Sequence, residues 1–345
     1  MNPRSFSGTP GTRIILLILL LTGLILPAAA ITVTDDAGAV VTLNATPRRI
    51  VSLAPSSTEI LAALGLTGRI AGVTDVCNYP PEVQNITHIG SYSSLSIEKI
   101  AASRPDLVVA SDITPQETVN RLRALGLIVV VISPHSIEDA LQDIRRLGTA
   151  TGTGITADRL AANLSARLSS ALPCPVPFGR PTVAHVVWYD PLYVSGNDTL
   201  QDDLIVHAGG RNVFADKSGW GTVSLEEFLM KNPDVILVNG GNGMDAKTND
   251  VILDAFMNNP QYASLSAVRN HRVYAVDADI LSRPAPRIVD ATGQVARLLH
   301  PACFTNTTTT PAVTPITTVK SPGFCAGSVV LLISLIMFLH GERSN

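Results

Sequence analysis

Aromatic side chains are scarce in this sequence, and several of them stand where predicted strands end. Only 2 tryptophans and 6 tyrosines occur among 345 residues. Trp188 and Tyr189 follow the apolar pair Val186-Val187, and Trp220 stands between two glycines, which makes it hard to bury. Because aromatic faces offer a large apolar area at little cost in side-chain entropy, these positions favour binding of a flat, apolar molecule. Ordinary core packing is the alternative for Trp188.

Polar residues follow the other predicted strands. Ligands of α/β sheets bind beyond the carboxyl ends of the strands, so residues in these loops are candidates to line a site. Three of them have a second interpretation, since Ser56 and Ser57 suit a helix N-cap and Arg283 suits an exposed surface charge. The candidate ligand-binding residues are Ser56, Ser57, Tyr79, Ser91, Tyr92, Ser111, His135, Trp188, Tyr189, Trp220, Asn239 and Arg283.

Motifs of familiar catalytic chemistry are missing. The sequence has no Gly-x-Ser-x-Gly elbow, no His-Glu-x-x-His pair and no GxxxxGK[ST] loop. Its 7 histidines show no metal-site spacing, and a bare metal ion would need distant ones such as His88, His135 and His207 to converge. We therefore expect a binding protein that is not an enzyme, with no catalytic cofactor and no metal site.

Composition excludes other classes of protein. A hydrophobic content of 46% is enough to form real cores, which excludes overall disorder. Only 15% of residues are charged and the net charge is -3, so the basic footprint of a nucleic-acid binder is missing. The length suits two domains of about 100–200 residues each.

Strand-like and helix-like segments alternate between the two ends of the chain. Short Val- and Ile-rich runs separated by helical periods predict mostly parallel sheets that are covered on both faces. These runs lie at 49–53, 70–73, 107–110, 128–132, 182–188, 235–239 and 272–276.

The segment 136–172 differs from the rest, because it keeps a helical period with one interruption at Gly148–Gly154. No strand pattern intervenes, so it predicts a long or kinked bridging helix. The expected fold class is α/β, with two lobes, each a mostly parallel central sheet flanked by helices, joined by one long bridging helix. The lobes are expected at 31–135 and 173–301.

A repeat supports the division into two lobes. Residues 96–110 align without gaps with residues 224–238, and Ser, Glu, Pro and Asp recur at the same positions. Each half is therefore expected to build the same helix-to-strand unit. The repeated acids Glu98 and Glu226 stand in the first turn of their helices, where the helix dipole stabilises a carboxylate by about 0.3–1 kcal/mol.

The two ends of the chain are expected to lie outside the fold. Arg4 and Arg13, an apolar run at 14–26 and three alanines at 28–30 are typical of a secretory signal, so residues 1–30 are expected to be removed. A threonine-rich stalk is expected at 302–321. Residues 322–345 resemble the PGF-type sorting tail of archaeal surface proteins, which is exchanged for a lipid; a retained membrane helix is the alternative. Both place the protein on the outer face of the cell membrane.

Several motifs together resemble a known family. The segments 49–60, 72–75, 105–108, 208–214 and 282–287 are similar to those of the periplasmic-binding family that delivers vitamin B12, iron-siderophores or haem to ABC importers. Cys77-Asn78-Tyr79-Pro80 is most similar to the cobalamin-binding branch. The resemblance implies two lobes that open only slightly around a ligand, here cobalamin or another corrinoid. The alternatives are an iron-siderophore or haem receptor, and a surface adhesion or sensory module.

The resemblance also implies partners and residue roles. Glu98 and Glu226 match the acids that dock into arginines of the ABC permease dimer, which works with its ATPase subunits. Stabilisation by the helix dipole is the other explanation for acids at these two positions. His135 could be an axial ligand to cobalt or haem iron, although a lone loop histidine is more often a surface group. The protein is expected to be a monomer. An exported chain can oxidise its thiols, and Cys174 and Cys303 flank the second lobe, so we expect them to pair.

Overall fold

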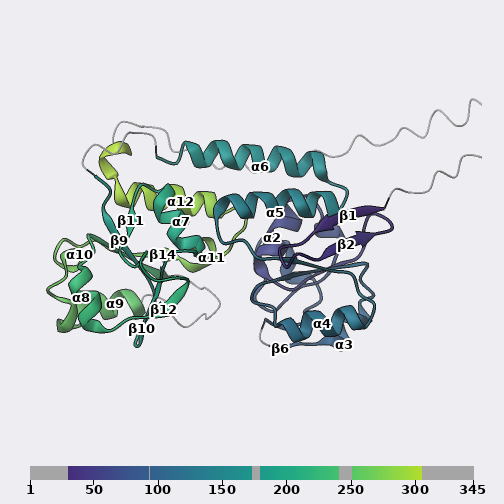
Figure 1. Cartoon of the computed structure of the whole chain (residues 1–345), viewed down its shortest axis with the longest axis horizontal. Helices are drawn as coiled ribbons and strands as arrows, with labels where there is room; N and C mark the ends of the chain where they lie inside the picture. The colour runs from purple at the N-terminus through teal and green to yellow at the C-terminus, as the bar shows by residue number, and fades with distance from the viewer. Residues whose placement is uncertain (1–29, 93, 173–178, 241–250, 305–345) are drawn as a thin grey trace, which may run out of the picture. The chain divides into compact units, whose positions relative to one another are not determined.

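The computed structural model describes residues 30–92, 94–172, 179–240 and 251–304. These described residues, which end at Phe304, belong to one compact unit that contains two larger sheets (Figure 1). The expected signal peptide up to residue 29, and the expected stalk and tail from residue 305, lie outside the described residues. Within the described ranges, we find no helix that is both long and apolar enough to cross a membrane.

The first lobe is built on a four-stranded parallel sheet in the order β4-β3-β7-β8. This confirms the four strands predicted in the first half of the sequence. Apolar residues alternate between its faces, so that Ile50 and Leu107 pack with α2 while Val51 and Val108 pack with α3 and α4. The elements are β3 (Ile50–Ser52), α2 (Pro55–Ala63), β4 (Ile70–Gly72), α3 (Ile97–Ala102), β7 (Leu107–Ser111), α4 (Gln116–Ala124) and β8 (Val129–Ile132).

The second lobe has a six-stranded mixed sheet. Strands β9 (Thr182–Tyr189), β13 (Val235–Gly240) and β14 (Val273–Asp277) are parallel and confirm the three strands predicted there. Strands β10 (Leu192–Ser195) and β12 (Trp220–Thr222) extend it antiparallel, which the sequence patterns did not predict. The remaining elements are β11 (Arg211–Asn212), α7 (Leu200–His207), α8 (Leu225–Lys231), α9 (Val251–Asn258), α10 (Ser266–Arg269), α11 (Ala278–Ser282) and α12 (Ile288–Leu299).

Two small hairpins complete the first lobe. Strands β1 (Ile31–Thr34) and β2 (Val40–Leu43) pair antiparallel, as do β5 (Gly90–Ser91) and β6 (Ser94–Leu95). Gly90 has φ +112°, and a Cβ there would lie 2.5 Å from the Ser94 carbonyl oxygen. Only glycine fits, so this position fixes the β5–β6 turn that carries Ser91 and Tyr92.

The segment predicted as one helix over 136–172 is two helices, which corrects the prediction. α5 (Ile137–Ala150) and α6 (Gly154–Ser169) form an antiparallel hairpin around the turn Thr151–Thr153 (Figure 1). Gly152 has φ +71°, and at Gly148 a Cβ would lie 2.2 Å from that of Ala157, so both glycines are needed for the close packing. The helix that leads to the second lobe is α6, and its Arg167 bonds Asp290 of α12.

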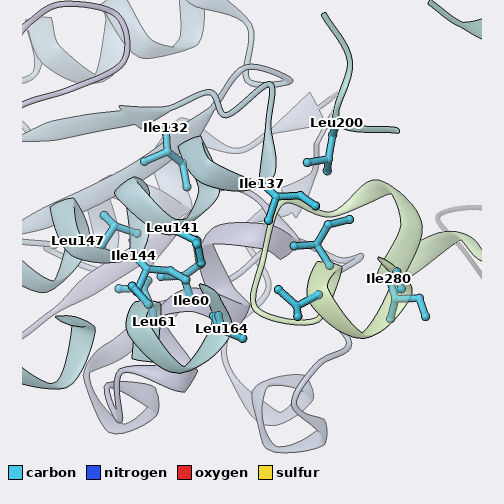
Figure 2. Close-up of a cluster of buried hydrophobic side chains, with 14 of the residues drawn as sticks. Ile60, Leu61, Ile132, Ile137, Leu141, Ile144, Leu147, Leu164, Leu200 and Ile280 are labelled. Carbon is cyan, nitrogen blue, oxygen red and sulfur yellow. The ribbon is translucent and has the colours of Figure 1, made fainter. Parts of the chain in front are cut away.

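One hydrophobic core runs through both lobes. It includes Ile60 and Leu61 of α2, Leu141 of α5, Leu164 of α6 and Leu200 of α7 (Figure 2). Separate cores cover the opposite faces of the two sheets. Because densely packed apolar interiors resist deformation, this shared core ties the lobes together on the side of α5, α6 and α12.

The sequence repeat corresponds to a structural repeat, α3–β7 in the first lobe and α8–β13 in the second. Ser96 and Ser224 both cap their helix by accepting the N–H three residues on, at 3.2 Å and 3.1 Å. Arg104 and Asn232, at equivalent positions, both have positive φ, 47° and 40°.

Asp106 and Asp234 complete the repeat. Asp106 accepts the backbone N–H groups of Arg48 and Arg49 ahead of β3, at 2.7 Å and 2.9 Å. Asp234 accepts both the N–H and the hydroxyl of Thr182 at the start of β9, at 2.8 Å and 2.7 Å. Each aspartate therefore fixes where its own strand lies against the neighbouring one.

Candidate functional site

Charged and amide side chains join the two lobes where strands end. Glu59 follows β3, Asn78 follows β4, and Asp279, Arg283 and Arg287 follow β14. We call these five residues the interlobe network. Nη1 of Arg283 lies 3.1 Å from Glu59 Oε1 and 2.7 Å from Asn78 Oδ1, and Nη2 lies 2.7 Å from Asp279 Oδ1. A further bond joins Asn78 Nδ2 to Asp279 Oδ2 at 2.7 Å.

Arg287 holds the same carboxylate from a second direction. Its Nε and Nη2 donate to the two oxygens of Glu59 at 2.8 Å and 2.5 Å, a bidentate pairing. Burial disfavours the charged guanidinium, but the bond and charge of Glu59 outweigh burial and raise the pKa of Arg287. The Arg287 guanidinium lies 4.0 Å from the centroid of the Tyr79 ring.

The interlobe network corrects the assignment of Arg283 as a ligand-binding residue. Its side chain is buried and its donors are taken by Glu59, Asn78, Asp279 and the Val76 carbonyl. The alternative of an exposed surface charge is wrong as well. The sequence patterns did not single out Glu59; its signals are its place in the family-like segment 49–60 and its charge in an otherwise apolar and small-residue helix.

The network shows that the carboxyl ends of strands from both sheets face each other. β14 is an edge strand of the second sheet, and β4 is an edge strand of the first, next to β3. Moving away from the network, the next strand ends are those of β13 and β9 in one lobe and of β7 and β8 in the other. These are the strand ends that could share a ligand.

Three aromatic side chains lie on one face of the second sheet, and we call them the aromatic patch: Trp188, Tyr193 and Trp220. Trp188 and Tyr193 are direct partners in the β9–β10 ladder. Tyr193 stacks on Trp220 with ring centroids 6.1 Å apart and planes at 12°. They are 37%, 37% and 40% exposed, whereas Val186 and Val194 point into the core on the other face. Core packing as the alternative for Trp188 is therefore wrong.

A buried histidine lies behind the aromatic patch. His185 has no exposed surface, its ring meets Trp220 edge-on at 5.9 Å, and its Nε2 lies 3.0 Å from Asn239 Oδ1. Burial lowers the pKa of His185 to about 4, although the bond to Asn239 opposes this. The imidazole is therefore neutral at physiological pH, and the predicted residue Asn239 is brought next to the patch.

Two of the predicted serines are buried. Ser57 is fully buried, and its hydroxyl donates to the Ala54 carbonyl at 2.9 Å. α2 begins at Pro55 with Ala54 as its N-cap, so neither Ser56 nor Ser57 caps the helix, and Ser56 is buried too. Contact of Ser57 with a ligand is therefore a wrong prediction.

The other candidates differ in how exposed they are. Tyr79, Tyr92 and His135 are exposed, and Ser91 and Tyr189 are half-buried. Ser111 is buried, and its hydroxyl, which has no partner among the described residues, lies in the wall of a cavity of about 200 Å³. Searching only the described residues, we find no cluster of three or more His, Cys, Asp or Glu side chains that could hold a metal ion.

The repeated acids lie at equivalent places on the two lobes, in the first turns of α3 and α8. Both are exposed. Bonds from the backbone and from the Ser96 hydroxyl lower the pKa of Glu98. The neighbouring Glu227 lies 2.9 Å from Lys217 Nζ, which occupies its carboxylate.

The cysteines are only partly described. Cys303 is disulfide-bonded, but the expected partner Cys174 lies outside the described residues, so the pairing stays a prediction. Cys77 is free and buried, and burial raises the pKa of its thiol.

Known proteins resemble this chain in sequence and in fold. A family model described as periplasmic binding protein matches residues 50–280. An uncharacterized ABC transporter substrate-binding lipoprotein of Bacillus subtilis is 29% identical over 282 residues, 79% of this chain and 87% of its own length. The periplasmic vitamin B12-binding protein of Vibrio cholerae superimposes with a TM-score of 0.66 and 28% identity, covering 74% of this chain and 98% of that one. A periplasmic heme-binding protein of Roseiflexus sp. RS-1 gives a TM-score of 0.66 and 30% identity, with 74% and 99% covered.

Proposed function

Because the chain belongs to the periplasmic binding protein family, we propose that it is the extracytoplasmic substrate-binding subunit of an ABC importer. It binds cobalamin or a related corrinoid between its lobes and delivers it to the permease. The ligand is the transported cargo, so the protein itself performs no reaction and needs no catalytic cofactor. Both the vitamin B12-binding and the heme-binding relatives support a flat ligand of this size class.

The aromatic patch is the observation that carries this proposal. Three large side chains are left about 40% exposed on one sheet face, although burying each would favour folding. The ring planes of Tyr193 and Trp220 are nearly parallel, so a flat ring can add to this stack. Tyr79, across the interlobe network, offers a further exposed aromatic face from the first lobe.

The two tryptophans give a direct test, because they are the only ones in the chain and both belong to the patch. Cobalamin should quench tryptophan emission with a Kd of about 1 µM or below, and the absorption spectrum of the bound corrinoid should shift. Trp220→Ala should weaken binding at least about tenfold. Met230→Ala, which removes an exposed apolar side chain of α8, is the matched control and should bind like the wild type.

The same titration separates the alternatives. Tight haem binding without a response to cobalamin would assign the haem branch, and a response to iron-siderophores alone would assign that branch. No response to any of the three ligands would favour the surface adhesion or sensory module and would contradict the proposal.

Transfer to the permease is proposed to depend on Glu98 and Glu226. Their equivalent, exposed positions on the two lobes suit docking onto a dimer through charge-assisted bonds to arginines. Glu98→Arg with Glu226→Arg should abolish stimulation of the transporter's ATPase while ligand affinity is kept. Glu117→Arg, an exposed acid in the first turn of α4, is the control, and equal stimulation by all variants would contradict docking.

We further propose that the chain is exported by its N-terminal signal and held at the cell surface by its C-terminal tail. Both segments lie outside the described residues, and the proposal rests on their sequence patterns. Truncation after Phe304 should release the protein into the medium. Mass spectrometry of the mature C-terminus should then distinguish a lipid from a retained helix, and membrane retention of the truncated protein would contradict the anchor.

A further inference from the structure

His185 stands at the centre of a buried hydrogen-bonded chain beneath the aromatic patch. Its Nδ1 lies 3.2 Å from Ser195 Oγ of β10, and its Nε2 lies 3.0 Å from Asn239 Oδ1 of β13. Its ring edge meets Trp220 of β12. One side chain therefore links four strands of the second sheet at the place where the candidate ligand face is formed.

The chemistry of these partners fixes the tautomer of His185. The imidazole is neutral, so one ring nitrogen donates and the other accepts. An amide oxygen can only accept, which means that Nε2 carries the proton and donates to Asn239 Oδ1. The hydroxyl of Ser195 then donates to Nδ1.

The structure sets the Asn239 carboxamide with Oδ1 toward His185 Nε2. With Oδ1 accepting from His185, the Nδ2 group forms the outward half of the amide. Asn239 is half-buried near the carboxyl end of β13, and among the described residues its Nδ2 has no hydrogen-bond partner. Nδ2 is thus a donor on the side of the amide away from His185, and an acceptor on a ligand would satisfy it.

We propose that His185 is a positioning residue, which turns the Asn239 amide so that Nδ2 donates to a carbonyl acceptor on the rim of a flat ligand that packs against the aromatic patch. This inference rests on the proposed function and adds to it the polar group that the ligand must carry. Corrinoids carry such acceptors as peripheral carboxamides. The stacking side chains tolerate many flat molecules, so the Asn239 donor gives the site a means of orienting the ring.

Paired ligands can test the direction of this hydrogen bond. Dicyanocobinamide carries carboxamides, which donate and accept, whereas dicyanocobyrinic acid heptamethyl ester carries carbonyls that only accept. Asn239→Asp keeps the oxygen that accepts from His185 but replaces the donor by a second acceptor. Binding of the ester, followed by tryptophan quenching, should weaken about thirtyfold, and that of cobinamide only about threefold, because an amide can turn its N–H toward the carboxylate.

Variants of His185 test positioning separately from folding. His185→Met frees the Asn239 amide to turn and should weaken ester binding about tenfold with little change for cobinamide. His185→Gln offers one donor and one acceptor in the same place, and should restore ester binding to within about twofold of the wild type. Circular dichroism of each variant reports whether the fold is kept.

The results distinguish a failure of the positioning role from a failure of the proposed function. Equal loss of both ligands in Asn239→Asp, or unchanged ester binding in folded His185→Met, would overturn the positioning role while leaving corrinoid binding intact. If the wild type binds neither ligand, the proposed function is wrong. In that case ¹⁵N NMR of the ligand-free protein still decides the geometry: an Nδ1-protonated His185 at neutral pH would overturn the inference, and an Nε2-protonated one would support the orientation of Asn239.

Discussion

The two lobes contain the same helix-to-strand unit but place different chemistry at their strand ends. In α3–β7 and α8–β13, a capping serine, a residue with positive φ and a strand-binding aspartate recur at equivalent positions. The first lobe then contributes Glu59 and Asn78, which are held in the interlobe network. The second lobe adds the antiparallel strands β10 and β12, which carry most of the aromatic patch.

The repeated units and the aromatic patch therefore have different roles in the molecule. The backbone groups at the ends of the repeated units are bonded within each lobe, so these units do not depend on a ligand for their structure. The aromatic patch is formed by strands that lie outside the repeat and leaves apolar surface exposed. The repeated units therefore support the sheet on which the aromatic patch lies, and the proposed ligand contacts come from the strands added to them.

The largest expected effect comes from breaking the interlobe network. Glu59→Gln removes the carboxylate between two buried or half-buried guanidinium groups, so the free energy of unfolding should fall by about 3–5 kcal/mol. Urea unfolding followed by circular dichroism measures the loss. Glu117→Gln on the exposed face of α4 should change the free energy by less than about 0.5 kcal/mol, and equal midpoints for both variants would show that the network does not stabilise the fold.

A second prediction concerns the buried histidine of the second lobe, which has no counterpart in the network. Since burial lowers the His185 pKa from 6.5 to about 4, the unfolded chain binds a proton in this range that the folded chain does not. Its contribution is fully present above pH 6.5, and about 3 kcal/mol is lost as the pH falls toward 4. Urea midpoints between pH 7.5 and 4 should show this loss in the wild type.

His185→Gln should remove most of that pH dependence. His271→Gln changes an exposed histidine and should leave the slope unchanged. If the urea midpoint of His185→Gln changes with pH as strongly as that of the wild type, other groups cause the pH dependence.

The smallest expected effects concern the equivalent aspartates of the two repeated units. Asp106→Ala and Asp234→Ala each remove a carboxylate that accepts two hydrogen bonds at a strand start, so each should cost about 1.5–3 kcal/mol. Thermal unfolding of the two variants compares the losses. If the losses in the free energy of unfolding differ by more than about 2 kcal/mol, the equivalent aspartates do not stabilise the two lobes to the same extent.

Periodicity predicted the parallel strands because their apolar runs are local signals. The helical hairpin was misread because α5 and α6 share one period, and only the glycines near 148–154 mark the break. The sequence patterns did not predict β10 and β12, because their residues, Leu-Tyr-Val-Ser and Trp-Gly-Thr, lack the Val- and Ile-rich run that marks the parallel strands. Arg283 was misassigned because its partners Glu59 and Asn78 lie 224 and 205 residues away.

The sequence by itself determined the α/β character, the duplicated unit and the family, since each is carried by short segments that can be recognised one by one along the chain. Only the tertiary structure decided which strand-end residues are available to a ligand. It placed Ser57 and Arg283 in buried bonds, left Trp188 and Trp220 exposed, and set His185 behind Asn239. The physical reason is that a side chain's role depends on whether its polar and apolar groups are satisfied by neighbours, and those neighbours come from distant parts of the chain.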